Sequence, residues 1–199
     1  MEINRLKKRF ASFLNDTISL PGGDEVTGAE LIRKRKGIYD VYRHKFASTQ
    51  VENLSESDFH HFLTPTGNMS WPLQRGCKRV TNRMERLREV LKYLQNEENE
   101  IADRLNEVLQ GGNFYIKGFG KNLATGLLHV FNWQKYGVWN NRSQTVLRKL
   151  DRLPNISYSN FGQSYSRFNS ELQRICKELE IDLAELDCFL WWLDDRKEL

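Results

Sequence analysis

The 199-residue sequence predicts an all-α protein. Apolar residues recur at three- and four-residue spacing along nearly the whole chain, which is the period of an amphipathic helix. Capping patterns precede several of these stripes. Only residues 114–119 alternate as a strand does, and that stretch is too short to found a sheet. We expect one domain, residues 1–199, or two packed lobes formed by residues 1–75 with the C-terminal helices and by residues 76–153.

The N-terminal part contains three expected helices. The first opens the chain, the second follows a capping box made by Thr27 and Glu30, and a short third helix follows Ser55. The stretches 20–24 and 64–76 carry proline and glycine and are expected to be irregular. The apolar positions of the three helices are Ile3, Leu6, Phe10, Phe13 and Leu14; Leu31, Ile38, Tyr42 and Phe46; and Phe59, Phe62 and Leu63.

Five more helices are expected outside the hairpin described below. Asn82 with Glu85 opens the first, Ser143 caps the third, and Asp182 with Glu185 caps the last. Their apolar positions are Leu87, Val90, Leu91 and Leu94; Ile101, Leu105, Val108 and Leu109; Val146, Leu147 and Leu150; Tyr165, Phe168, Leu172, Ile175 and Leu179; and Leu183, Leu186, Leu190 and Leu193.

The net charge of +4 is modest, but its distribution is uneven. Basic residues cluster at 7–9, 33–36 and 75–88, whereas acidic residues gather at 97–107 and in the last twenty positions. This segregation indicates a face toward a polyanion, although each run alone also suits a solvated helix face. We expect no membrane span, no signal peptide, no cofactor and no metal site. The three scattered cysteines are typical of a reduced cytoplasm.

The segment K-G-F-G-K-N at 117–122 is expected to form a turn that opens a helix. Gly118 and Gly120 permit positive φ and close approach of a phosphate to the backbone. The amides around Lys121 and Asn122 would then form an anion site at the helix N-terminus. The alternative is a purely structural corner between helices. The interruption at Gly111 and Gly112 requires either a separate short turn at 113–117 or a distorted hairpin.

The run G-F-G-K-N-L-A-T resembles the hairpin of helix-hairpin-helix DNA-binding proteins, in particular the DNA glycosylase-like superfamily. The resemblance implies two helical lobes around the hairpin. It also implies a catalytic aspartate where this chain has Asn140, and a lyase lysine where it has Asn122, with Lys121 one position earlier. The catalytic candidates are therefore Asn140 and Lys121, together with Asp151 on the next helix as an acid that would substitute for the missing aspartate.

Three function classes follow from this interpretation. The first is a protein that binds modified, damaged or foreign duplex DNA, around an unusual or flipped base, without catalysis. The second is an active glycosylase or AP lyase that removes a modified base. The third is a helical protein-interaction subunit.

The expected DNA contacts combine the hairpin, the polar turn that follows its helix, and a basic stretch before it. Trp139 would stack on a base or anchor the core, and Asn140 and Asn141 would bond to DNA or cap a helix. The full set is Lys117, Gly118, Gly120, Lys121, Asn122, Trp139, Asn140, Asn141, Arg142, Trp71, Arg75, Lys78 and Arg79.

A second resemblance covers residues 50–193 through W-P-L-Q-R-G at 71–76, K-G-F-G-K, K-Y-G-V-W-N-N at 135–141 and the closing D-L-A-E-L-D-C-F-L-W-W. Together these look like a bacterial domain of modification-dependent restriction and phage-defence proteins. This implies recognition of foreign DNA near the bacterial nucleoid. It also implies that a nuclease or other defence-system partner supplies cleavage.

Overall fold

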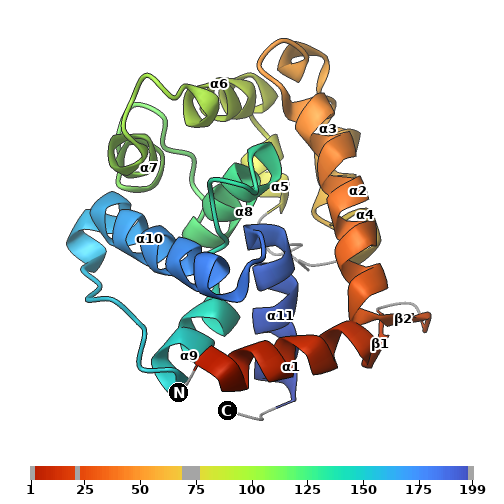
Figure 1. Ribbon diagram of the computed structural model, residues 1–199. Helices are drawn as coiled ribbons and strands as arrows, with labels where there is room; N and C mark the ends of the chain where they lie inside the picture. Colours follow the sequence, from red (N-terminus) through yellow and green to blue (C-terminus); the bar gives the residue numbers. More distant parts are fainter. Residues whose placement is uncertain (1–2, 21–22, 69–76, 197–199) are drawn as a thin grey trace.

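The computed structural model describes residues 3–20, 23–68 and 77–196, and they form a mainly helical protein (Figure 1). The all-α prediction is confirmed. The α-helices are α1 (Ile3–Asn15), α2 (Gly28–Phe46), α3 (Glu56–Phe62), α4 (Pro65–Asn68), α5 (Cys77–Thr81), α6 (Met84–Gln95), α7 (Ile101–Leu109), α8 (Lys121–Phe131), α9 (Asn141–Lys149), α10 (Phe161–Leu179) and α11 (Leu183–Asp195). Two 3-10 turns, η1 (Val51–Asn53) and η2 (Tyr158–Asn160), connect them.

Local capping signals explain where several helices begin. Thr27 caps α2, Ser55 caps α3 and Asp182 caps α11, and each forms a reciprocal capping box with the residue three positions later. In each box a side-chain oxygen accepts a hydrogen bond from a backbone N–H that lacks a partner within the helix.

Two predicted caps are wrong. Helix α6 begins at Met84 after Arg83, whose side chain makes no capping bond, and Asn82 lies in the preceding turn. Helix α9 is capped by Asn140, and Ser143 is the third residue of that helix rather than its cap. The Ser143 hydroxyl instead accepts a bond from the Asn140 backbone N–H, which completes a capping box.

A two-stranded antiparallel sheet that the sequence did not predict flanks the stretch 20–24, which was expected to be irregular. Strand β1 (Thr17–Ser19) pairs with β2 (Glu25–Thr27), and the buried Ile18 lies opposite the buried Val26. Next to this pairing, the Leu20 N–H donates to the Asp24 carbonyl at 2.7 Å, so the two ends of the stretch expected to be irregular lie close together. Three residues per strand are too few to reveal alternation in a sequence.

Helix α8 lies at the centre of the molecule (Figure 1). Every residue from Leu123 to Val130 is buried, and α2, α6 and α7 all contact the helix. A helix buried on all sides belongs inside a core. Buried apolar side chains from Leu6 to Leu193 form one contiguous cluster around it. The division into two lobes stays a prediction.

Candidate nucleic-acid interface

The connection between α7 and α8 is built from two consecutive turns. The Tyr115 N–H donates to the Gly112 carbonyl at 3.1 Å, and the Phe119 N–H donates to the Ile116 carbonyl at 3.0 Å. Gly118 is the third residue of the second turn, with φ of 97°, a value that strains any residue with a side chain. Of the two geometries expected for this interruption, the separate turn is the one observed.

Helix α8 begins without a side-chain cap. Its N-cap is Gly120, with φ of −93° and ψ of 173°, and the Gly120 carbonyl accepts bonds from Leu123 and Ala124. A Cβ added at Gly120 would meet no atom within 4 Å. Neither backbone strain nor packing therefore requires glycine here. Its effect is to leave the first turn of α8, where the positive end of the helix dipole lies, uncovered by a side chain.

The hairpin borders an open hollow of about 350 Å³. Tyr115 forms part of its wall, with 45% of its surface exposed. No role was predicted for Tyr115, although its place between Gly111-Gly112 and the glycines at 118 and 120 indicates a residue held in a turn. The hollow is lined by Leu109, Gln110, Tyr115, Gly118, Phe119, Gly120, Lys121 and Phe161. The hollow therefore brings together the start of α8, the aromatic ring of Tyr115 and the basic side chain of Lys121.

The cations expected around the hairpin differ in their surroundings. Lys117 is exposed, and the partly exposed Lys121 places its ammonium 5.4 Å from the centre of the Trp139 ring. Arg142 instead faces the C-terminal end of α11, with its guanidinium 3.9 Å from Asp194 and 3.7 Å from Asp195. Lys117 and Lys121 therefore stand at the hairpin, whereas the charge of Arg142 is balanced by two carboxylates.

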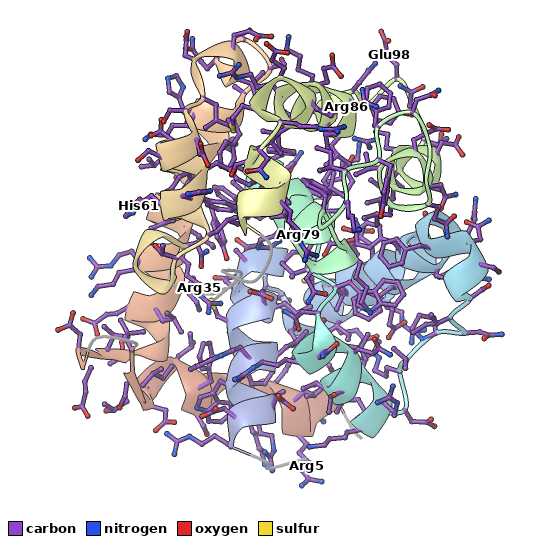
Figure 2. All side chains as sticks on the ribbon, turned by 180° about the vertical axis from the view of Figure 1, so that it is seen from behind. Arg5, Arg35, His61, Arg79, Arg86 and Glu98 are labelled. Atoms are coloured by element: carbon purple, nitrogen blue, oxygen red, sulfur yellow. The ribbon has the colours of Figure 1, made fainter. Side chains whose placement is uncertain are left out.

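The basic stretch before the hairpin is described only in part. Arg79 is exposed on α5 (Figure 2). Lys78 belongs to the same helix, but its side chain lies outside the described residues, as do Trp71 and Arg75. The expected role of these last three residues in DNA binding stays a prediction.

The structure decides between the alternatives for Trp139. Its indole is fully buried, stacks on Phe168 at 4.5 Å with 9° between the planes, and donates from Nε1 to Gln144 at 3.0 Å. Trp139 therefore anchors the core, and the prediction that it stacks on a base is wrong for this conformation. Asn140 is a helix cap, as described above, whereas Asn141 is exposed on the first turn of α9.

Asn122 carries an unusual feature. It lies in the first turn of α8, and its side-chain oxygen Oδ1 is enclosed without a hydrogen bond from any described residue. A buried acceptor without a donor is rare in folded proteins and is often explained by water, an ion or a functional role. Asn122 therefore remains a candidate site residue.

Side chains from three helices, α8, α9 and α10, hold the segment between α8 and α9 in an extended conformation. Its backbone groups are paired with side chains as follows: the Lys135 carbonyl with Asn169 and Gln173, the Tyr136 carbonyl with His129, the Gly137 N–H with Asn169, the Gly137 carbonyl with Tyr165, the Val138 carbonyl with Ser143, and the Trp139 N–H with Thr125. The K-Y-G-V-W-N-N segment is therefore held in place by hydrogen bonds within the protein.

Two of the candidate catalytic residues, Asn140 and Asp151, lie at opposite ends of α9. The Asn140 side-chain oxygen accepts the Ser143 N–H at 2.9 Å and is occupied as a cap. Asp151 follows the opposite end of α9, eleven positions later, which corresponds to about 16 Å along a helix axis. Lys121 lies one helix earlier, at the start of α8. Asn140 and Asp151 are thus too far apart to act on one reacting atom, whereas the Lys121 ammonium lies 5.4 Å from the centre of the Trp139 ring.

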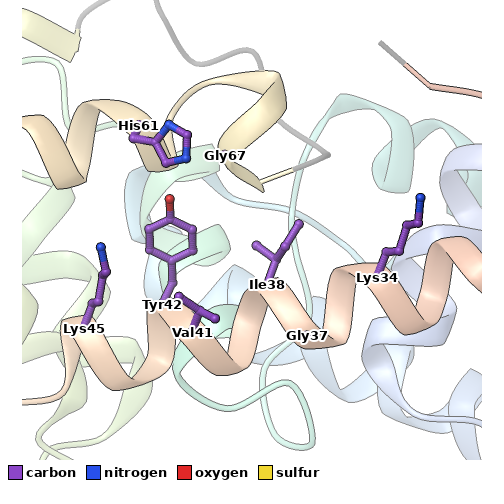
Figure 3. Close-up of a pocket in the computed structure, with 8 residues that line it drawn as sticks. All are labelled: Lys34, Gly37, Ile38, Val41, Tyr42, Lys45, His61 and Gly67. Atoms are coloured by element: carbon purple, nitrogen blue, oxygen red, sulfur yellow. The ribbon is translucent and has the colours of Figure 1, made fainter. Parts of the chain in front are cut away.

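A second hollow of about 500 Å³ lies between α2 and the α3–α4 segment (Figure 3). Tyr42 and His61 face one another across it, and Lys34 and Lys45 stand toward its two ends. The Lys45 ammonium is held by Asp58 at 2.6 Å. Hydrogen bonds from Lys45 and Ser55 lower the pKa of that carboxyl to about 2, so the pair stays charged. The charge of Lys45, one of the two lysines that line this hollow, is therefore neutralised by Asp58.

A buried polar group between α2, α8 and α11 was not predicted. Arg35, taken as part of a surface basic run, is 3% exposed and donates to Asp187 and Cys188. Arg35 lies four residues after Leu31 and four before Tyr39, so it shares their buried face of α2. This spacing could have indicated its burial, but the neighbouring basic residues obscure the pattern. Nearby His129 is fully buried, and burial lowers its pKa. Burial also raises the pKa of the Cys188 thiol to about 11, which keeps it protonated.

Comparison with protein-family models, curated proteins and solved structures finds no match to this chain. The likeness to glycosylase-like proteins therefore rests on the residues quoted above. Within the described ranges, no helix is both long and apolar enough to cross a membrane. No three His, Cys, Asp or Glu side chains of the described residues form a group suited to a metal ion.

Proposed function

We propose that this chain binds duplex DNA through the phosphate backbone at the hairpin between α7 and α8, and that its targets are modified, damaged or foreign DNA. The observation that carries the proposal is the bare glycine cap of α8. Gly120 has no conformational or packing need to be glycine, yet it places no capping side chain at the start of an 11-residue helix beside an open hollow. A phosphate oxygen fits such a helix end.

The neighbouring charges support the same proposal. Lys117 and Lys121 lie on either side of Gly118 and Gly120 and add attraction to phosphate that decreases with salt. Contacts of this kind position a duplex but do not read its sequence. Recognition of modified or foreign DNA rests on the two resemblances alone, as does the proposal that a nuclease partner supplies cleavage.

Catalysis by this chain is the less supported alternative. A glycosylase needs a carboxylate near the sugar that it attacks, and at the expected position this chain places an amide already engaged as a helix cap. Incubation with duplexes that contain alkylated or deaminated bases, followed by detection of released base, tests this alternative directly. Base release by the wild-type protein that the Asn140→Ala variant lacks would establish the enzyme.

The binding proposal is tested by fluorescence anisotropy with a labelled 20-base-pair duplex at several salt concentrations. We expect the affinity to fall steeply as salt rises, and Lys121→Glu to weaken binding on the order of tenfold. The matched control is Lys177→Glu, because Lys177 is exposed on α10 outside the hairpin hollow and the charge change is the same. Equal effects of the two variants, or no binding at low salt, would contradict the proposal.

A further inference from the structure

Tyr115 is the exposed aromatic residue of the hairpin hollow. Exposed large hydrophobic side chains are rare in the described ranges, and the other example, Val41, lies on α2. Tyr115 contributes to the hollow that Gly118, Gly120 and Lys121 also line. Its ring is thus placed beside the helix end where the proposed phosphate contact lies.

The backbone that carries Tyr115 is firmly held. The preceding residue, Phe114, stacks on Tyr93 with 4.0 Å between ring centres and 9° between planes, and Arg86 lies over the Phe114 ring at 5.4 Å. The following residue, Ile116, is buried. Because both neighbours are anchored in the protein, the chain presents the Tyr115 ring to solvent from a fixed position.

The hollow has the chemistry of a site for one nucleotide unit. Its lining combines the aromatic face of Tyr115 and the apolar Leu109 and Phe119 with the amide-rich start of α8 and Lys121. Aromatic side chains stack on bases of any type, whereas amides and ammonium groups take the phosphate. In an intact duplex the bases are already stacked on one another and expose little of their faces to such a ring.

We propose that Tyr115 stacks on an unstacked base, so that this hairpin binds single-stranded DNA in preference to intact duplex of the same length. The inference rests on the proposed phosphate contact and adds the residue that distinguishes the two forms of DNA. The apolar part of the hollow favours a base over a second phosphate at this position.

The test compares binding of a 12-nucleotide single strand and a blunt 12-base-pair duplex by fluorescence anisotropy at one fixed salt concentration. Tyr115→Ala should weaken single-strand binding on the order of tenfold and change duplex binding less than twofold. Tyr115→Phe keeps the ring and should behave as the wild-type protein does. Val41→Ala removes the other exposed hydrophobic side chain and should leave both affinities unchanged.

Two results would overturn the inference. Tyr115→Ala could leave single-strand binding unchanged, or it could weaken binding of both DNA forms equally, which would indicate a general contact. Failure of the broader proposal gives a different pattern, because the wild-type protein would then bind neither DNA. Lys121→Glu separates the two roles, since it should weaken binding of both forms while Tyr115→Ala affects the single strand.

Discussion

Replacing Gly120 by aspartate should increase stability and weaken DNA binding at the same time. The backbone of Gly120 already has the extended geometry of an N-cap residue, and a Cβ added there meets no other atom within 4 Å. An aspartate at this position would accept hydrogen bonds from the first-turn amides of α8. The carboxylate would then occupy the place proposed for a phosphate oxygen.

The two effects have estimated sizes. Exchanging glycine for aspartate at an N-cap contributes a few tenths of a kcal/mol, and a carboxylate near the helix dipole adds about 0.3–1 kcal/mol. The free energy of unfolding should therefore rise by about 0.5–1 kcal/mol, which corresponds to a Tm increase of about 1–4 °C for a chain of this size. Loss of one phosphate contact should weaken duplex binding on the order of tenfold.

Thermal unfolding by circular dichroism and anisotropy with the 20-base-pair duplex measure both effects on the same samples. The control is Gly120→Asn, which caps a helix about as well but adds no negative charge. We expect it to give only the capping part of the stability gain, a few tenths of a kcal/mol, and to bind DNA better than the aspartate variant. A raised Tm with unchanged duplex affinity would refute the view that these amides face DNA. A lowered Tm would refute the capping argument.

Three further predictions concern stability, each measured by urea denaturation. Gly162→Ala should lower the free energy of unfolding by about 2–3 kcal/mol, because the new methyl would lie 1.9 Å from a backbone oxygen of α7. The control is Gly37→Ala in α2, where the new methyl meets open space and should raise the free energy of unfolding by about 0.5–1 kcal/mol. Thr125→Val should cost about 1–3 kcal/mol, because the buried Trp139 N–H loses its acceptor. Burial lowers the pKa of His129 in the folded protein, so the unfolded chain binds the proton more readily and stability decreases as the pH falls below about 6.5. This contribution is at most about 1.4 kcal/mol per pH unit, and His129→Asn should remove it.

Each of these predictions has a contrary outcome. Similar stability changes for Gly162→Ala and Gly37→Ala would show that α7 and α10 can move apart at little energetic cost. An unchanged midpoint for Thr125→Val would mean that the Trp139 N–H finds another acceptor. A wild-type pH dependence in the His129→Asn variant would assign the acid sensitivity to other groups.

Most of the helices were predictable because their signals are local. The capping residues of α2, α3 and α11 lie three positions from their partners, and the apolar stripes need only one turn of context. The β-hairpin was missed because each strand has three residues and the pairing, Ile18 with Val26, is not contained in either strand alone.

The candidate site was predictable only in part. The turn at Gly118 and the start of α8 follow from nearby residues. The burial of Trp139 and Arg35 depends on α10 and α11, which come later in the chain. Whether an aromatic or basic residue faces the core or solvent is decided by such distant packing partners. The same limit applies to Tyr115, whose exposure no local pattern reveals.

The side-chain bonds to the extended segment between α8 and α9 also limit how the chain can be divided. Tyr165, Asn169 and Gln173 all come from α10, and together they satisfy the Lys135 carbonyl and both backbone groups of Gly137. A fragment that ended near residue 153 would keep the hairpin but leave these three groups without their partners. Such a fragment would therefore lose the hydrogen bonds by which α10 holds the segment between the helix of the hairpin and α9.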